Sequence, residues 1–167
     1  MGDKGLIPWR EVASWSCNAC GNCCVGYRVP LRMDEFVKVS NACGNSVLEY
    51  GTGKVYLRNG PDRRCILQHP YMGRWLCTIQ GMKPTACRLF PFRIHNKPVY
   101  NRGDNSSYEW GDHTYYVYLD PDCEGIVKGK PTLRFSNEVL PEIMRSGLGV
   151  SLKQRYSTSK YIGWTPP

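Results

Sequence analysis

The chain has 167 residues, a formal net charge of +8 and nine cysteines. This length is typical of one domain, or one domain with a tail, and is sufficient to bury a hydrophobic core. No apolar run is long enough to span a membrane, and the residues after Met1 lack the apolar segment of a secretory signal peptide. We therefore expect a cytoplasmic protein, where a cysteine cluster indicates metal binding or catalysis more often than disulfides.

The first dense chemical feature is a cysteine loop. Residues 1–14 are predicted to be a loose N-terminal lead-in, with Trp9 and Trp15 as anchors, and the loop follows as Cys17-Asn18-Ala19-Cys20-Gly21-Asn22-Cys23-Cys24. Thiolates spaced two residues apart can turn toward one centre, as in zinc knuckles and iron–sulfur loops. Gly21 supplies the backbone freedom that a tight loop requires. This stretch predicts a metal site.

Regular elements are expected between this loop and the next cysteines. Residues 25–31 are predicted to be a short extended segment, and Asp34 can cap a helix at about 34–43 that stops at Gly44. Residues 47–50 are expected to continue that helix after a break. The alternation over 54–58 is typical of a strand.

The middle of the chain returns to cysteine. Cys65 and Cys77 are followed by the run Lys83-Pro84-Thr85-Ala86-Cys87-Arg88-Leu89-Phe90-Pro91-Phe92, which favours a short helical turn around Cys87. Strands are predicted over 98–100 and 114–119, and the turn over 120–125 carries Cys123.

The composition changes after Cys123. Residues 132–156 contain no cysteine and predict one or two helices, followed by a tail. We therefore divide the chain into a lead-in (1–14), a cysteine-cluster metal-binding domain (15–130) and a C-terminal helical segment with its tail (131–167). The expected fold class is α+β: a small, irregular, metal-stabilised domain with short strands and a few helices.

The cysteine loop, the Lys83–Phe92 run and the Cys123-x-Gly125 turn together resemble the CxxCxxCC cysteine-cluster family of zinc- or iron-chelating domain proteins. Lys83 and Glu124 depart from the family pattern, where arginine and proline are usual, and Cys43 matches no family position. A related cysteine arrangement occurs in flagellin lysine N-methylases, which are larger and carry an iron–sulfur cluster. The resemblance implies metal binding by eight cysteines: Cys17, Cys20, Cys23, Cys24, Cys65, Cys77, Cys87 and Cys123.

Eight thiols are enough for two four-thiolate sites. In a C-x-x-C-x-x-C loop, three cysteines hold one cluster and a remote cysteine completes it; Cys87 is our choice for that fourth position. Neighbouring side chains in an extended segment point in opposite directions, so Cys24 is expected to face a second centre. The first centre would take Cys17, Cys20, Cys23 and Cys87, and the second Cys24, Cys65, Cys77 and Cys123. A single cluster with the remaining thiols structural is the alternative.

The spacing leaves the metal open between one or two [4Fe–4S] clusters and Zn²⁺, because both accept four thiolates. The tight loop favours iron–sulfur. His69, His95 and His113 occupy no metal-binding spacing, and Cys43 is interpreted as a small apolar side chain. Each four-thiolate site carries a charge of about −2, so two sites would lower the net charge to roughly +4.

Three functions fit these residues. The first is an iron–sulfur protein that acts as an electron carrier or as an accessory subunit of a larger complex with a protein partner. The second is a zinc-stabilised module that docks on RNA or on an acidic protein. The third is a methyltransferase-related enzyme, which ranks last because the chain has no glycine-rich cofactor loop between a strand and a helix. No catalytic residues are assigned, and a role other than an enzyme is favoured.

Overall fold

The computed structural model describes residues 5–99, 103–151, 153–156 and 158. The chain divides into two compact units, which we call the first and the second unit. The first unit comprises Met1–Asn18 and Leu89–Ser157, and the second comprises Ala19–Arg88 and Thr158–Pro167. Short strands in several small sheets combine with helices in both units, which confirms the predicted α+β class.

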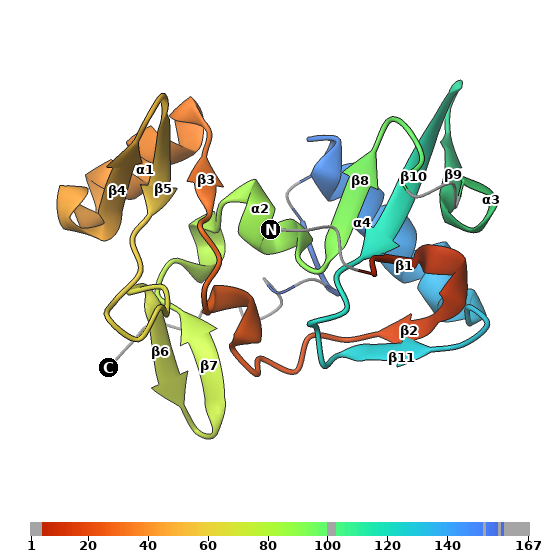
Figure 1. Ribbon diagram of the computed structural model, residues 1–167, viewed down its shortest axis with the longest axis horizontal. Helices are drawn as coiled ribbons and strands as arrows, with labels where there is room; N and C mark the ends of the chain where they lie inside the picture. Colours follow the sequence, from red (N-terminus) through yellow and green to blue (C-terminus); the bar gives the residue numbers. More distant parts are fainter. Residues whose placement is uncertain (1–4, 100–102, 152, 157, 159–167) are drawn as a thin grey trace. The chain divides into compact units, whose positions relative to one another are not determined.

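The first unit is built around an antiparallel sheet with the strand order β1-β10-β8, in which β9 also pairs with β10 (Figure 1). A separate ribbon pairs β2 with β11. The elements of this unit are β1 (Ile7–Pro8), η1 (Trp9–Glu11), β2 (Val12–Trp15), β8 (Phe92–His95), α3 (Gly103–Ser106), β9 (Ser107–Trp110), β10 (His113–Leu119), β11 (Ile126–Lys128), the π-helical turn η5 (Phe135–Val139) and α4 (Leu140–Gly147).

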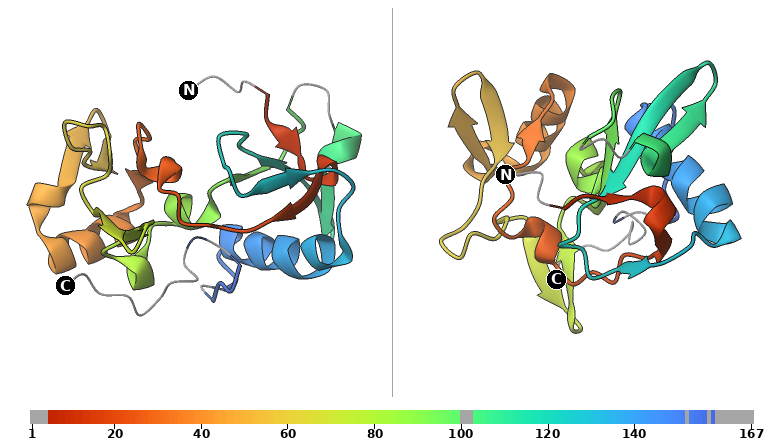
Figure 2. Two further views of the ribbon diagram at one scale, coloured as in Figure 1. Left: turned by 90° about the horizontal axis from the view of Figure 1, so that it is seen from below. Right: turned by 45° about the vertical axis from the view of Figure 1, so that its right-hand side comes forward.

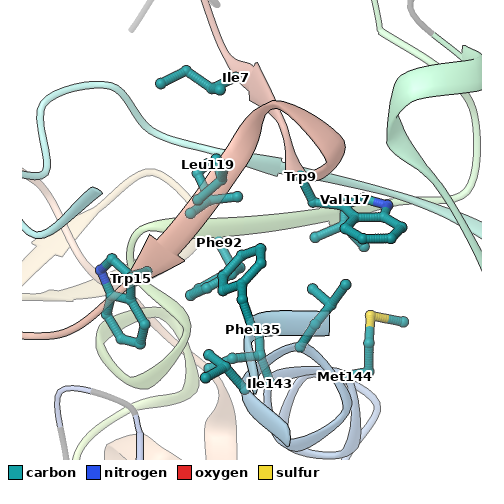
Figure 3. Close-up of a cluster of buried hydrophobic side chains, with 12 residues drawn as sticks. Ile7, Trp9, Trp15, Phe92, Val117, Leu119, Phe135, Ile143 and Met144 are labelled. Atoms are coloured by element: carbon teal, nitrogen blue, oxygen red, sulfur yellow. The ribbon is translucent and has the colours of Figure 1, made fainter. Parts of the chain in front are cut away.

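The core of the first unit is apolar and rich in aromatic rings (Figure 3). The rings of Trp15 and Phe92 meet edge to face with their centroids 5.0 Å apart. Phe135 stacks on Phe92 at 6.3 Å and is 1% exposed. Helix α4 contributes fully buried side chains such as Ile143 to the same cluster. This packing stabilises the fold of the first unit, because large buried aromatic rings remove much apolar surface from water.

The described part of the predicted lead-in is more ordered than the sequence indicated. Trp9 and Trp15 are buried, as expected of anchors, but β1, just before Trp9, pairs with β10, and β2, which ends at Trp15, pairs with β11. The strand partners lie more than a hundred residues away, so local sequence carries no signal for this pairing.

The second unit contains a three-stranded antiparallel sheet with the order β3-β5-β4 and a separate β6–β7 hairpin. Helix α1 runs beside the β4–β5 hairpin, as both views of Figure 2 show. The elements are η2 (Asn22–Cys24), β3 (Pro30–Leu31), α1 (Met33–Cys43), η3 (Asn45–Val47), β4 (Leu48–Gly51), β5 (Lys54–Leu57), β6 (Gln68–Tyr71), β7 (Arg74–Cys77), η4 (Gln80–Met82) and α2 (Thr85–Leu89), whose last residue belongs to the first unit.

Several local predictions are confirmed. Helix α1, strand β5, the helical turn around Cys87, strand β10 and the helices after residue 132 lie where the sequence placed them. The helical continuation over 47–50 is wrong, because Leu48 begins a strand that pairs with β5. The strand predicted over 98–100 is not found at Pro98 and Val99, and Tyr100 lies outside the described residues. Among the helices that the structure describes, none has the length and apolar character needed to cross a membrane.

Candidate metal centre

The cysteine loop is anchored to the β6–β7 hairpin through Trp75. The backbone N–H of Trp75 donates a hydrogen bond to the carbonyl oxygen of Ala19 at 2.8 Å. Gly21 has a φ of +85°, and a Cβ atom built on it would lie 2.6 Å from the Trp75 ring. Ala19 also adopts a positive φ of 57°. Glycine is therefore required at position 21 both for its backbone conformation and for the close approach of the indole.

Cys23 and Cys24 lie on the single 3-10 turn η2, and their sulfur atoms are 3.8 Å apart. The expectation that Cys24 points away from Cys23 is wrong, because it assumed an extended segment with adjacent side chains on opposite sides, whereas adjacent side chains of a 3-10 turn are only about 120° apart. The carbonyl oxygen of Cys24 accepts a hydrogen bond from the N–H of Cys65 at 2.8 Å. The turn is thereby tied to the next family cysteine along the chain.

Besides Cys43, whose charge adds to the raised pKa of Cys77, five predicted ligands of the second unit lie close enough for their charges to affect one another. They are Cys23, Cys24, Cys65, Cys77 and Cys87. We call this group the thiol cluster. Cys65 is buried in the core of the second unit, and three further members, Cys24, Cys77 and Cys87, pack against that core.

The protonation of the thiol cluster reflects its burial. Burial raises the pKa of Cys65 to about 11, and the thiols of Cys77 and Cys23 add to this shift. Burial is also the main cause that raises the pKa of Cys77 and of Cys87. Several thiolates in one poorly hydrated region repel one another, so each thiol disfavours ionisation of the next.

Cys23 and Cys24 share a hydrogen bond that has opposite effects on the two thiols. It lowers the pKa of Cys23 to about 7, against the effect of burial and with help from the cations of Lys83 and Arg64. The same bond, together with burial and the neighbouring thiols, raises the pKa of Cys24. Cys23 is thus the member of the pair that carries the negative charge most readily.

Lys83 is the cation that acts on most of the thiol cluster. Its charge opposes the upward shifts in the pKa of Cys65, Cys77 and Cys87 and favours the Cys23 thiolate. Its ammonium group donates a hydrogen bond to the carbonyl oxygen of Thr158 at 2.9 Å. The charge of Lys83 does not offset burial at the four thiols other than Cys23, so Cys24, Cys65, Cys77 and Cys87 favour the neutral form.

This donor set fits a bound thiophilic cation. Sulfur ligands select zinc or iron–sulfur centres, and a cation among the thiols would reverse the direction of the pKa shifts that burial causes. Next to Cys87, the Nε atom of Arg88 is buried and has no hydrogen-bond partner in the described part of the chain, so it is available to an anionic metal–thiolate group. Over residues 5–99, 103–151, 153–156 and 158, no group of three His, Cys, Asp or Glu side chains is already arranged to hold an ion.

Two other predicted ligands, Cys17 and Cys123, belong to the first unit. The indole N–H of Trp15 donates to the sulfur of Cys123 at 3.3 Å, and the N–H of Ser16 donates to the carbonyl oxygen of Gly125 at 3.1 Å. The two cysteines therefore flank paired strands, one just after β2 and one just before β11. A Cβ atom on Gly125 would lie 2.1 Å from the carbonyl oxygen of Ser16, so only glycine allows this close pairing.

Comparison with protein families decides how these cysteines are interpreted. Residues 16–124, well over half of the chain, match the family model named CxxCxxCC, described as a "putative zinc- or iron-chelating domain". The chain belongs to the CxxCxxCC family. No curated protein and no solved structure gives a significant match.

Membership of the CxxCxxCC family supports a cysteine-ligated metal-binding role. The structure brings Cys23, Cys24, Cys65, Cys77 and Cys87 together in the second unit, places Cys20 on the loop beside Gly21 and places Cys17 and Cys123 on adjoining segments of the first unit. Cys43 ends α1 and packs against the core of the second unit, in keeping with its interpretation as a small apolar side chain. How the eight CxxCxxCC cysteines divide between centres stays a prediction.

Three residues that support this CxxCxxCC site did not stand out in the sequence. Lys83 was noted only as a departure from the family pattern, Trp75 had no recognised role, and Glu35 was assigned only to a helix. The sole sequence signal for Trp75 is an aromatic residue two positions before Cys77. Glu35 gives no such signal, because its partner Thr85 is fifty residues away.

Proposed function

We propose that this chain is a cytoplasmic iron–sulfur protein that acts as an electron carrier or as an accessory subunit of a larger complex. The observation that carries the proposal is the gathering of five family cysteines in one partly buried region of the second unit. The tight C-x-x-C-x-x-C spacing of the loop supports iron–sulfur rather than zinc. A role other than that of an enzyme is favoured, as the sequence indicated.

The ligands would come from the eight family cysteines, four to each centre, or from one set of four with the others structural. A bound [4Fe–4S] cluster supplies reversible one-electron transfer. The protein's own contribution is to bury the thiols and surround them with cations. Lys83, Arg64 and Arg88 would offset part of the roughly −2 charge that a four-thiolate cluster carries, which favours both binding and reduction.

A zinc-stabilised module that docks on RNA or on an acidic protein is the second candidate. The observation that favours it is the pairing of arginine and aromatic side chains in the second unit. The guanidinium of Arg28 lies 4.3 Å from the ring centroid of Tyr56, and its side chain is 54% exposed. Such pairs can accept a phosphate and a base together. A methyltransferase-related activity is the third candidate and rests only on the family resemblance.

Anaerobic purification followed by elemental analysis and absorbance spectroscopy tests the proposal. We expect a brown protein with the broad visible absorbance of thiolate-bound iron and with stoichiometric iron and inorganic sulfide. Colourless protein with stoichiometric zinc would overturn the iron–sulfur proposal in favour of the second candidate. Strongly salt-dependent RNA binding by that zinc form would favour its RNA version.

Substitution of single cysteines tests the ligand assignment. Cys65→Ser and Cys20→Ser are expected to lower the metal content, because each removes a soft ligand that serine does not replace. Cys43→Ser is the matched control, since Cys43 lies in the same unit but matches no family position, and it should retain the metal. Full metal content in Cys20→Ser would show that the assignment of that cysteine is wrong.

A further inference from the structure

The side chain of Glu35 is a carboxylate in an unusual place. It is 8% exposed and lies near the start of α1, yet its two oxygens bond to two different helices. Oε2 accepts a hydrogen bond from the N–H of Arg32 at 3.0 Å, which caps α1. Oε1 accepts two hydrogen bonds from Thr85, one from its N–H and one from its hydroxyl, both at 2.7 Å.

Only the first of these contacts is explained by the needs of α1. A glutamate at the third position of a helix commonly accepts a hydrogen bond, through one oxygen, from the backbone N–H of the residue that precedes the helix. Its other oxygen then stays in water. Here the second oxygen is directed at Thr85, the first residue of α2. The carboxylate therefore connects two helices that are fifty residues apart in the sequence.

Helix α2 depends on such outside contacts for its position. It has five residues, and a helix of this length has no stability of its own. Cys87 is its central residue, so the place of the Cys87 sulfur is set by whatever holds the helix. A second contact holds Cys87 itself, because the hydroxyl of Thr158 donates to the carbonyl oxygen of Cys87 at 2.8 Å.

We propose that Glu35 is a positioning residue of the metal centre, which fixes the start of α2 and thereby directs the Cys87 thiol into the thiol cluster. The proposal rests on the proposed metal-binding function. It assigns to Glu35 the role that outer hydrogen-bond partners have in metal sites, where they orient the ligands without touching the metal. Arg88 extends the connection, since its Nη2 donates to the hydroxyl of Thr85 at 3.3 Å.

The test is site-resolved alkylation of the metal-loaded protein. Iodoacetamide is added during a slow challenge with a chelator, and the labelling rate of each cysteine is followed by mass spectrometry. Glu35→Ala is expected to accelerate labelling of Cys87 by about ten-fold or more, which is the size of effect that loss of an outer partner has on metal affinity. Labelling of Cys65 should change little.

Two further variants separate positioning from general destabilisation. Glu35→Gln keeps an oxygen that can accept both hydrogen bonds from Thr85, so it should restore most of the protection of Cys87. Thr85→Val removes the hydroxyl bonds to Glu35 and Arg88 but keeps the N–H bond to Glu35, so it should accelerate Cys87 to a lesser extent. Glu49→Ala is the matched control, because Glu49 is a carboxylate of the same unit that is 44% exposed and pairs only with Arg28 among the contacts described.

The outcomes are distinct. Equal acceleration at every cysteine of the thiol cluster in Glu35→Ala, or an unchanged rate at Cys87, would overturn the positioning role while leaving metal binding intact. If the cysteines of the unsubstituted protein are labelled at the rate of free thiols before any chelator is added, the proposed function fails, and the positioning role fails with it.

Discussion

The buried cores of the two units differ in composition: the first is rich in aromatic rings, and the second includes a cysteine. Among the described residues, the buried core of the first unit contains Trp9, Trp15, Phe92 and Phe135. The corresponding core of the second unit contains no aromatic ring and includes Cys65, with other cysteines packed around it. Apolar burial contributes roughly 25 cal/mol per Å², so the first unit can be stable through packing alone. In the second unit, aliphatic side chains and Cys65 form the core, and Phe36 and further cysteines pack against it.

The two units therefore differ in the origin of their stability. A core built from aromatic and aliphatic groups needs no ligand, whereas a region of clustered thiols gains its stability when a cation joins them, because metal-binding energy is then folding energy.

Removal of the metal is expected to have the largest effect. Structural metal sites contribute about 10–16 kcal/mol of apparent binding free energy, so a strong chelator should unfold much of the second unit and leave the first folded. Hydrogen exchange with mass spectrometry provides the measurement: amides of β5 should lose protection and those of β10 should keep it. If both units lose protection together, the contrast between them is wrong.

Truncation of a buried aromatic side chain should destabilise the first unit rather than the second. Phe135→Ala removes a side chain that is 1% exposed and should cost about 3–5 kcal/mol of unfolding free energy. Denaturant-dependent hydrogen exchange at β10 measures the loss, and the metal content should not change. Val127→Ala is the control, since Val127 is 56% exposed in the same unit and should change stability by about 0.5 kcal/mol or less.

A pair of glycine substitutions examines the second unit more finely. Gly21 and Gly53 both have positive φ angles, but only Gly21 has a side chain, that of Trp75, in the space a Cβ would occupy. Gly53→Ala should cost about 1–2 kcal/mol from backbone strain alone. Gly21→Ala should cost more and should also lower the metal content, measured by elemental analysis. Equal effects of the two substitutions would show that the contact with Trp75 does not hold the cysteine loop.

The smallest effect is expected from acid titration of Glu35. Burial raises the pKa of Glu35, but the hydrogen bonds from Arg32 and Thr85 outweigh this and leave the pKa below its usual value. The resulting stability is fully present above the ordinary glutamate pKa of about 4.3 and is lost as the pH falls through the lower folded-state pKa.

The comparison of wild type with Glu35→Gln isolates this contribution. The difference in unfolding free energy should be about 1 kcal/mol near neutral pH and should shrink toward zero as the solution becomes acidic. A difference that is independent of pH would contradict the assignment of the effect to the Glu35 charge.

Much of the local structure could be predicted from the sequence. Helix α1 was expected from a polar start and from Gly44 at its end, and strand β10 from its β-branched and aromatic residues. That Cys65, Cys77 and Cys87 act together with the loop cysteines was implied by the resemblance to the CxxCxxCC family. For the helix and the strand, the decisive information lies within a few neighbouring residues.

What could not be predicted depends on contacts between distant segments. The 3-10 turn that brings Cys23 and Cys24 together is fixed by the bond from Cys65 to the carbonyl of Cys24, which no local pattern reveals. The bond from Trp15 to Cys123 joins residues 108 positions apart. Periodicity and spacing describe how a segment folds, and they contain no information about which remote partner it meets.

The makeup of the first core has a practical consequence for anyone who prepares a shortened recombinant protein. The family match covers residues 16–124, yet most of the buried side chains of that core come from outside this span, and only Phe92, Val117 and Leu119 fall within it. A fragment limited to residues 16–124 would therefore retain its cysteines but lose most of the core side chains against which Cys17 and Cys123 pack. Such a fragment should aggregate, whereas one that extends from before Ile7 to beyond Thr158 keeps both these core side chains and the hydrogen bonds that Thr158 makes with Lys83 and Cys87.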